Sequence, residues 1–191
     1  MPDADFSRTV WSFLDVETTG LSPWSGDRVC EIAILRCRDG EVQEEFQSLV
    51  NPERPISPEA QAIHGISPEM VRQSPKFREL APKIRSFIHD SIVVCHNAPL
   101  DISFIRAEFA RIGEPLSDLI LVDTLKLARK HFQFSSNSLG FLAKSLGVSP
   151  QGWHRAGNDV EILRRVFDQF LKQPHQRGPL ELKQLITPNV F

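Results

Sequence analysis

Short apolar runs, separated by turn-forming residues, make up the first part of the chain. Residues 10–16 are nearly all apolar and lead into a Thr-Thr-Gly sequence, which predicts a buried strand that ends in a turn. Residues 28–36 and 42–50 have the composition of two further strands, and Asp39-Gly40 between them favours a hairpin. We therefore expect the chain to begin with a meander of three antiparallel strands.

Apolar residues at helical spacing dominate the rest of the chain. The predicted helices cover residues 77–88, 99–112, 124–132, 138–146 and 159–171. Asn158 and Glu161 suit a capping box at the start of the last helix. Two short apolar strands, 91–95 and 119–122, lie between helices. This order predicts an α/β fold whose mixed five-stranded sheet combines the antiparallel meander with parallel strands, flanked by helices.

Length and composition indicate a single domain. With 191 residues, of which 41% are hydrophobic, the chain is long enough to bury one substantial core. We expect this domain to cover residues 1–173. Residues 174–191 show no long periodic pattern, so we expect them to form a loosely packed C-terminal tail.

Charge and cysteine content narrow the class of protein. No run approaches the roughly 18 apolar residues of a membrane span, and the acidic N-terminus is unlike a secretory signal. We therefore expect a soluble cytoplasmic protein that does not bind a membrane. The three cysteines lie far apart in apolar segments, which favours reduced core thiols over a zinc cluster. A net charge of −2 argues against tight, non-specific binding of duplex DNA.

The first predicted strand ends in two carboxylates. Because successive side chains of a strand point to opposite faces, Asp15 and Glu17 share one face while Leu14 and Val16 point into the core. Two aligned carboxylates at the end of a buried strand are costly unless a cation compensates them, and a divalent ion is a natural partner. An acidic turn without a metal is the alternative interpretation of so short a motif.

Three further candidates lie at the ends of predicted elements. Asp101 falls in the first turn of one helix, and Asp159 falls at the start of another, five residues after His154. Each has an ordinary explanation, because acidic residues stabilise a helix N-terminus and a loop histidine needs no function. Together with Asp15 and Glu17, however, they form a set of carboxylates and one histidine at element ends, where function is common in α/β folds.

The segments around Asp15, Asp101 and Asp159 resemble, in order, the Exo I, Exo II and Exo III motifs of the DnaQ-like, or DEDD, exonucleases. This family divides into a tyrosine branch and a histidine branch according to the third motif. The chain contains no tyrosine, and His154 matches the histidine branch, which includes the epsilon proofreading subunit of bacterial DNA polymerase III. The resemblance implies an RNase H-like fold and a 3′-to-5′ exonuclease.

The same resemblance implies a two-metal mechanism. Asp15 would bridge two divalent ions, Mg²⁺ or Mn²⁺, while Glu17 and Asp159 would complete one site and Asp101 would support the other. His154 would be the general base, because an imidazole near its ordinary pKa takes up a proton at neutral pH. No small-molecule cofactor is expected.

Contacts to the terminal nucleotide are also implied by the resemblance. They would come from the turn after the first strand and from segments opposite it: Thr18, Gly20, Leu21, His64, Ile66 and Asn97. Leu100 departs from the family pattern, because epsilon-like members usually carry phenylalanine at this place. A stacking contact is therefore expected to be weaker or to come from elsewhere.

The expected substrates are single-stranded or mismatched 3′ ends of DNA, released as nucleoside monophosphates. A DNA polymerase is a candidate partner, and proofreading during DNA replication is a candidate role. The motifs do not separate DNA from RNA members, so an RNA-trimming exonuclease of the RNase T or oligoribonuclease type is the alternative. A catalytically silent scaffold that binds nucleic acid is a second alternative, which the full set of reactive side chains disfavours.

Overall fold

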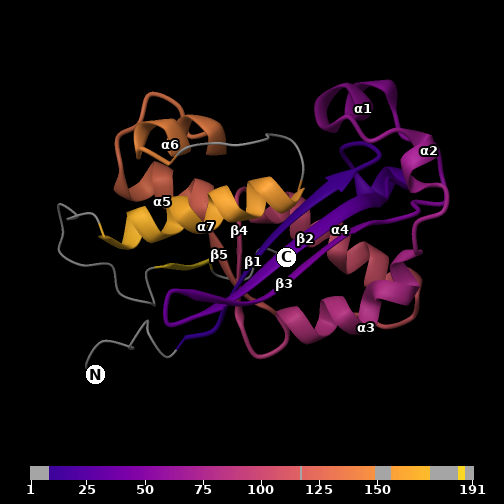
Figure 1. Cartoon of the computed structure of the whole chain (residues 1–191), viewed down its shortest axis with the longest axis horizontal. Helices are drawn as coiled ribbons and strands as arrows, with labels where there is room; N and C mark the ends of the chain where they lie inside the picture. Colours follow the sequence, from indigo (N-terminus) through magenta and orange to yellow (C-terminus); the bar gives the residue numbers. More distant parts are fainter. Residues whose placement is uncertain (1–8, 117, 149–155, 173–184, 188–191) are drawn as a thin grey trace.

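A mixed sheet forms the centre of the structure. The computed structural model describes residues 9–116, 118–148, 156–172 and 185–187. Within these residues, six strands form one sheet in the order β3-β2-β1-β4-β5-β6. Helix α7 lies along one face of the sheet, and α3 and α4 cover the other face (Figure 1). This arrangement confirms the expected α/β architecture with helices on both sides.

The strands follow the predicted order. Their bounds are β1 Trp11–Thr18, β2 Val29–Arg38, β3 Glu41–Leu49, β4 Ile92–Cys95, β5 Ile120–Asp123 and β6 Ile186–Thr187. The β1–β2 and β2–β3 pairs are antiparallel, whereas the β1–β4 and β4–β5 pairs are parallel. Asp39 and Gly40 have φ values of 56° and 78°, as a tight hairpin turn requires. The predicted meander is therefore confirmed.

The described part of the sheet has six strands, so the expected count of five was wrong. The additional strand, β6, pairs antiparallel with β5, and the Asp123 backbone N–H donates to Thr187 Oγ1 at 3.2 Å. A strand of two residues is too short to show an alternating pattern, so its pairing alone reveals it. Most of the predicted tail, 174–191, lies outside the described residues.

The five helices predicted from the periodic pattern are present, whereas two short α-helices and one 3₁₀ helix among the described residues were not predicted. Their bounds are α1 Pro58–His64, α2 Pro68–Val71, α3 Phe77–Ile88, α4 Ala98–Arg111, α5 Thr124–His131, α6 Leu139–Ser145 and α7 Ala156–Lys172, with a 3₁₀ helix, η2, at Pro23–Ser25. The start predicted for α7 was three residues late. Asn158 therefore lies inside the helix, and the expected capping box is wrong. None of the described helices is both long and apolar enough to cross a bilayer.

Two apolar layers enclose β1. On one face, the rings of Trp11 and Phe13 contact that of Phe167 in α7, with centroids 5.0 and 5.7 Å apart. On the other face, Leu14 and Val16 pack among residues of α3 and α4. This alternation is the one that a buried strand predicts. The two carboxylates of β1 therefore continue the face that α7 covers.

Candidate active site

Three carboxylates meet where β1 ends and α7 begins. One oxygen each from Asp15, Glu17 and Asp159 lies within 4.8 Å of the other two. β1 supplies the first two residues, and the first turn of α7 supplies the third. Because Phe167 in α7 packs on Trp11 at the start of β1, the helix runs antiparallel to the strand and its N-terminus reaches the carboxylates. Carboxylate oxygens at this separation could hold a divalent cation.

Asp101 adjoins this group but lies outside it. Its side chain is buried in the first turn of α4, and Oδ1 accepts a hydrogen bond from the Val16 backbone N–H at 3.3 Å. Val16 lies between the two carboxylates of β1, so Asp101 is held beside Asp15 from the opposite layer. The structure thus groups three of the four predicted carboxylates and places the fourth next to them.

The carboxylates repel one another in a poorly solvated site. Burial, followed by the charge of Asp101, raises the pKa of Asp15 well above its ordinary value, and Glu17 and Asp159 add to the shift. Burial also raises the pKa of Asp101 to about 8, although backbone hydrogen bonds oppose this shift. Without a cation the site therefore favours protonated carboxyl groups, and a bound cation would favour the ionised forms.

Glu31 is a further acidic residue at the site, and the sequence interpretation missed it. Its side chain is buried, and it lies opposite Glu17 in the β1–β2 register. Its carboxylate accepts hydrogen bonds from Gln47 Nε2 at 3.0 Å and from the Ala156 backbone N–H at 3.2 Å. Glu31 therefore ties β3 to the first residue of α7, the helix that carries Asp159. The available signal was an acidic residue within the apolar run of β2.

Internal contacts hold the turn that follows β1. Thr18 Oγ1 donates a hydrogen bond to the carbonyl oxygen of Gly20 at 2.7 Å. A side chain at Gly20 would displace the carboxylate of Asp27, because a Cβ atom there would lie 2.4 Å from Oδ2 of Asp27. Leu21 comes next and is 84% exposed. These three turn residues follow Glu17 directly, and their contact with a nucleotide remains a prediction.

His64 and Ile66 support the same turn. The Ile66 backbone N–H donates to Nδ1 of His64 at 3.0 Å, so the neutral ring carries its proton on Nε2 and donates it to the Thr18 carbonyl oxygen at 3.3 Å. Ile66 is fully buried in a small cluster with Cys30, and His64 is nearly buried. His64 thus contacts the turn directly, whereas Ile66 acts through its backbone N–H, and the contact of either side chain with a nucleotide stays a prediction.

Asn97 lies at the end of β4, on the same edge of the sheet. It is exposed, has a φ of 73°, and its backbone N–H donates to Oδ1 of Asp123 at 3.1 Å. Asp123 is buried and caps α5, so it joins the carboxyl ends of β4 and β5. His154 lies outside the described residues, and its role as a base therefore remains a prediction.

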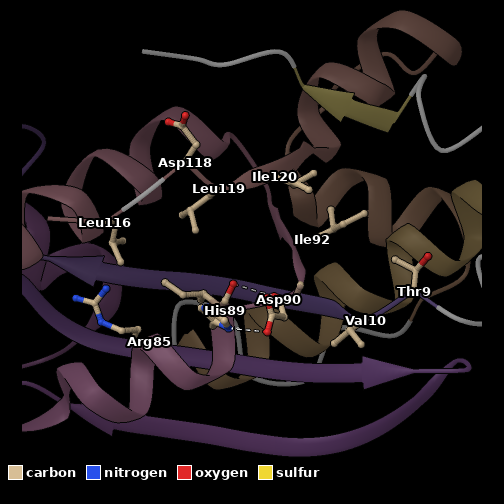
Figure 2. A pocket seen from close by; sticks show the side chains of 12 residues that line it. Thr9, Val10, Arg85, His89, Asp90, Ile92, Leu116, Asp118, Leu119 and Ile120 are labelled. Atoms are coloured by element: carbon tan, nitrogen blue, oxygen red, sulfur yellow. Dashed lines mark hydrogen bonds and ion pairs between the residues drawn. The ribbon is translucent and has the colours of Figure 1, made fainter.

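A separate pocket lies at the other end of the sheet. It encloses about 350 Å³, and its lining includes Val10, Ile92 and Ile120 at the starts of β1, β4 and β5 (Figure 2). Because these strands are parallel, the pocket lies at the edge opposite to the carboxylates. The pocket therefore has no part in the acidic site.

Known proteins that resemble this chain are nucleases and DNA polymerases. A family model described as Exonuclease (RNase_T) matches residues 12–167. The PolC-type DNA polymerase III of Thermotoga petrophila is 32% identical over 183 residues, which cover 96% of this chain and 13% of that protein. The 3′-5′ exonuclease DinG of Bacillus subtilis is 32% identical over 173 residues, which cover 90% of this chain and 19% of that protein. The chain thus spans less than a fifth of either relative.

Solved structures share this fold. Exonuclease X, in complex with 5′ overhanging duplex DNA, has a TM-score of 0.69 and 28% identity, over 84% of this chain and 90% of that one. A complex of E. coli ExoI with single-stranded DNA has a TM-score of 0.77 at 22% identity, which shows likeness of fold over 86% of this chain and 41% of that one. Because the family match spans β1 to β5 and includes Asp15, Glu17, Asp101 and Asp159, this chain belongs to the exonuclease family.

Proposed function

We propose that this chain is a metal-dependent 3′-to-5′ exonuclease that releases nucleoside monophosphates from 3′ ends of DNA. The observation that carries the proposal is the group of Asp15, Glu17 and Asp159, whose carboxylate oxygens lie within 4.8 Å of one another. Membership of the exonuclease family and the similarity to PolC-type polymerase and to DinG support this reaction class.

The three grouped carboxylates would hold the metal, with the charge of Asp101 beside them. Hard oxygen ligands suit Mg²⁺ or Mn²⁺, and the family resemblance implies two ions. Bound ions would lower the pKa of the attacking water and would neutralise charge on the phosphoryl oxygens. The fold holds the carboxylates close together despite their mutual repulsion. The Val16 N–H holds Asp101 for this purpose, and Glu31 holds the start of α7.

His154 is the proposed general base. An imidazole with a pKa near its ordinary value of about 6.5 accepts a proton from water at neutral pH. His154 precedes Ala156 by two residues, and the carboxylate of Glu31 binds the Ala156 N–H. This contact fixes the first described residue of α7, the helix that carries Asp159.

DNA is the proposed substrate. The PolC-type relative is a DNA polymerase, and exonuclease X was solved with duplex DNA. A polymerase partner, a proofreading role and a cytoplasmic location belong to the same proposal. Because the 2′-hydroxyl distinguishes RNA from DNA, matched DNA and RNA oligonucleotides test the choice of substrate.

Replacing Asp15 with asparagine is expected to abolish hydrolysis while the fold remains intact, because the amide removes a charged metal ligand. The measurement is release of monophosphates from single-stranded DNA, mismatched primer ends and RNA with Mg²⁺ or Mn²⁺. Asp118→Asn is the matched control, since this exposed carboxylate lines the distant pocket. Substantial activity of Asp15→Asn at saturating Mg²⁺ would contradict the assignment.

Replacing His154 with alanine is expected to lower turnover by roughly 10²-fold or more, because the attacking water loses its proton acceptor. Steady-state kinetics on single-stranded DNA measure this loss, and the pH profile of kcat should also lose its acidic limb. His89, exposed beside the distant pocket, provides the matched control His89→Ala. Unchanged turnover in His154→Ala would rule out the role of base.

Stability of the metal-free protein is expected to fall as the pH rises. In the folded state the pKa of Asp101 is raised to about 8 and that of Asp15 is raised as well, whereas unfolded aspartate has a pKa of about 3.9. Protonation of these two carboxyl groups therefore stabilises the folded state. Its contribution to the free energy of unfolding is lost as the pH rises from about 4 to about 8. Mn²⁺ should raise the melting temperature more at pH 8 than at pH 5, because it replaces the bound protons. An equal effect at both pH values, or in Asp15→Asn, would contradict this expectation.

Replacing Glu31 with alanine is expected to lower kcat about 10-fold or more, because small displacements of catalytic groups are costly and the start of α7 loses its acceptor. The Mn²⁺ concentration for half-maximal activity should rise, while KM for DNA should change little. Glu31→Gln keeps an acceptor oxygen for Ala156 and should recover part of the loss. Glu45→Ala on exposed β3 is the control. Equal kinetics in Glu31→Ala and Glu45→Ala would show that Glu31 does not position Asp159.

A further inference from the structure

Two large apolar side chains are exposed in the loop that follows the acidic end of β1. Leu21, in the turn after β1, is 84% exposed, and Trp24, in η2, is 85% exposed. Tryptophan is usually well buried, so an indole ring in solvent on the loop that follows the acidic strand indicates a contact surface. Both residues belong to the loop between β1 and β2, and Trp24 follows Glu17 by only seven residues.

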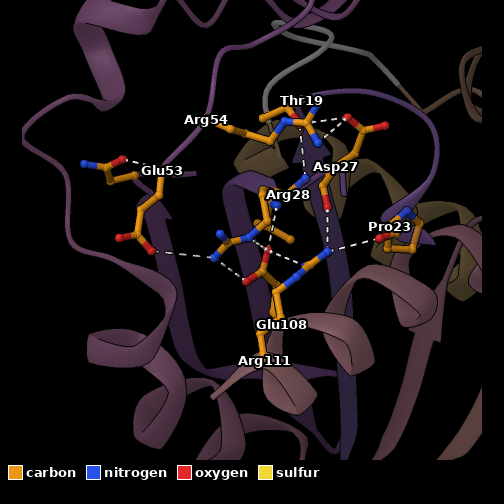
Figure 3. A network of polar contacts seen from close by, with 10 residues as sticks. Thr19, Pro23, Asp27, Arg28, Glu53, Arg54, Glu108 and Arg111 are labelled. Carbon is orange, nitrogen blue, oxygen red and sulfur yellow. Dashed lines mark hydrogen bonds and ion pairs between the residues drawn. The ribbon is translucent and has the colours of Figure 1, made fainter. Parts of the chain in front are cut away.

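The loop that carries Trp24 is firmly closed (Figure 3). A backbone hydrogen bond from the Thr19 N–H to the Arg28 carbonyl oxygen, 2.9 Å long, joins its two ends. Inside the loop, the carboxylate of Asp27 accepts hydrogen bonds from Thr19 Oγ1 at 3.2 Å and from the Ser22 N–H at 3.1 Å. These contacts fix the backbone on both sides of η2.

Helix α4 anchors the same loop. Arg111 Nη2 donates to the carbonyl oxygen of Pro23 at 3.0 Å, directly before Trp24, and Arg111 Nη1 donates to Glu108 at 3.3 Å. Glu108 is buried and also accepts two hydrogen bonds from Arg28, at 2.7 and 2.9 Å (Figure 3). Removing one partner from buried charges of this kind is strongly destabilising, so the network holds the backbone next to Trp24 while the indole ring lies in solvent.

The network under the loop carries an excess of positive charge. Its members are linked by ion pairs and consist of four cations, Arg28, Arg54, Lys76 and Arg111, and three carboxylates, Asp27, Glu53 and Glu108. This charge contrasts with the acidic cluster at the end of β1. These ion-paired residues together carry one net positive charge, so they do not repel a phosphate backbone as the carboxylates of β1 do.

We propose that Trp24 is a stacking platform for unpaired bases of the substrate strand, on the 5′ side of the 3′-terminal nucleotide. The inference rests on the proposed nuclease function and adds a strand-binding surface outside the carboxylate group. An indole ring stacks on any base, so the contact contributes affinity without sequence preference. Because the loop is already ordered by Asp27 and Arg111, stacking costs little conformational entropy.

The test compares two substrates of the full chain. One is a short single-stranded DNA, and the other is the p-nitrophenyl ester of thymidine 5′-monophosphate, which has no neighbouring base. Trp24→Ala is expected to lower the ratio of their kcat/KM values, DNA to ester, about 10-fold or more, mainly through KM for DNA. Trp24→Phe keeps an aromatic ring and should restore most of this ratio. Circular dichroism checks that the exposed substitution leaves the fold unchanged.

Ile120→Ala is the matched control, because Ile120 is 51% exposed and lines the pocket at the opposite end of the sheet. An equal ratio in Trp24→Ala, Ile120→Ala and the unaltered protein would overturn the stacking role while hydrolysis itself still stands. An equal loss in Trp24→Phe and Trp24→Ala would also overturn it. If the unaltered protein hydrolyses neither substrate, the proposed function fails, and that result is distinguishable from a failure of the stacking role.

Discussion

The mutual repulsion of carboxylates at the end of β1 is the constraint on which the rest of the site depends. Asp15, Glu17 and Asp159 stay within 4.8 Å of one another only because α7 is held along the strand. Aromatic contacts of Phe167 with β1 hold the far part of this helix. Apolar burial along one half of the strand therefore offsets the electrostatic cost at its other half.

Backbone N–H groups moderate this repulsion. Glu31 accepts a hydrogen bond from the Ala156 N–H, and Asp101 accepts one from the Val16 N–H. Hydrogen bonds of this kind favour the ionised carboxylate, while burial opposes it. As a result, the ionised forms of these buried carboxyl groups are unfavourable unless a cation is bound. In α4, by contrast, the buried carboxylate of Glu108 forms ion pairs with the guanidinium groups of Arg28 and Arg111, which neutralise its charge.

The fold was largely predictable where local pattern and packing agree. Helix α3 and strands β1 and β2 have long periodic or continuous apolar segments, so their type was evident before any tertiary contact was known. The prediction missed strand β6 and placed the start of α7 too late, because neither feature has such a signal. β6 has two residues and exists through its pairing with β5. The first described N–H of α7, that of Ala156, donates to the carboxylate of Glu31 on β2, which is far away in the sequence.

The sequence by itself determined that Asp15 and Glu17 share a face, because a strand alternates with a period of two residues. It also marked Asp101 and Asp159 as acidic residues at helix starts. Only the tertiary structure decided that Asp159, 144 residues after Asp15, joins the group while Asp101 binds the backbone of β1. The reason is that helix packing against the sheet, and no local pattern, sets distances between segments so far apart in the chain.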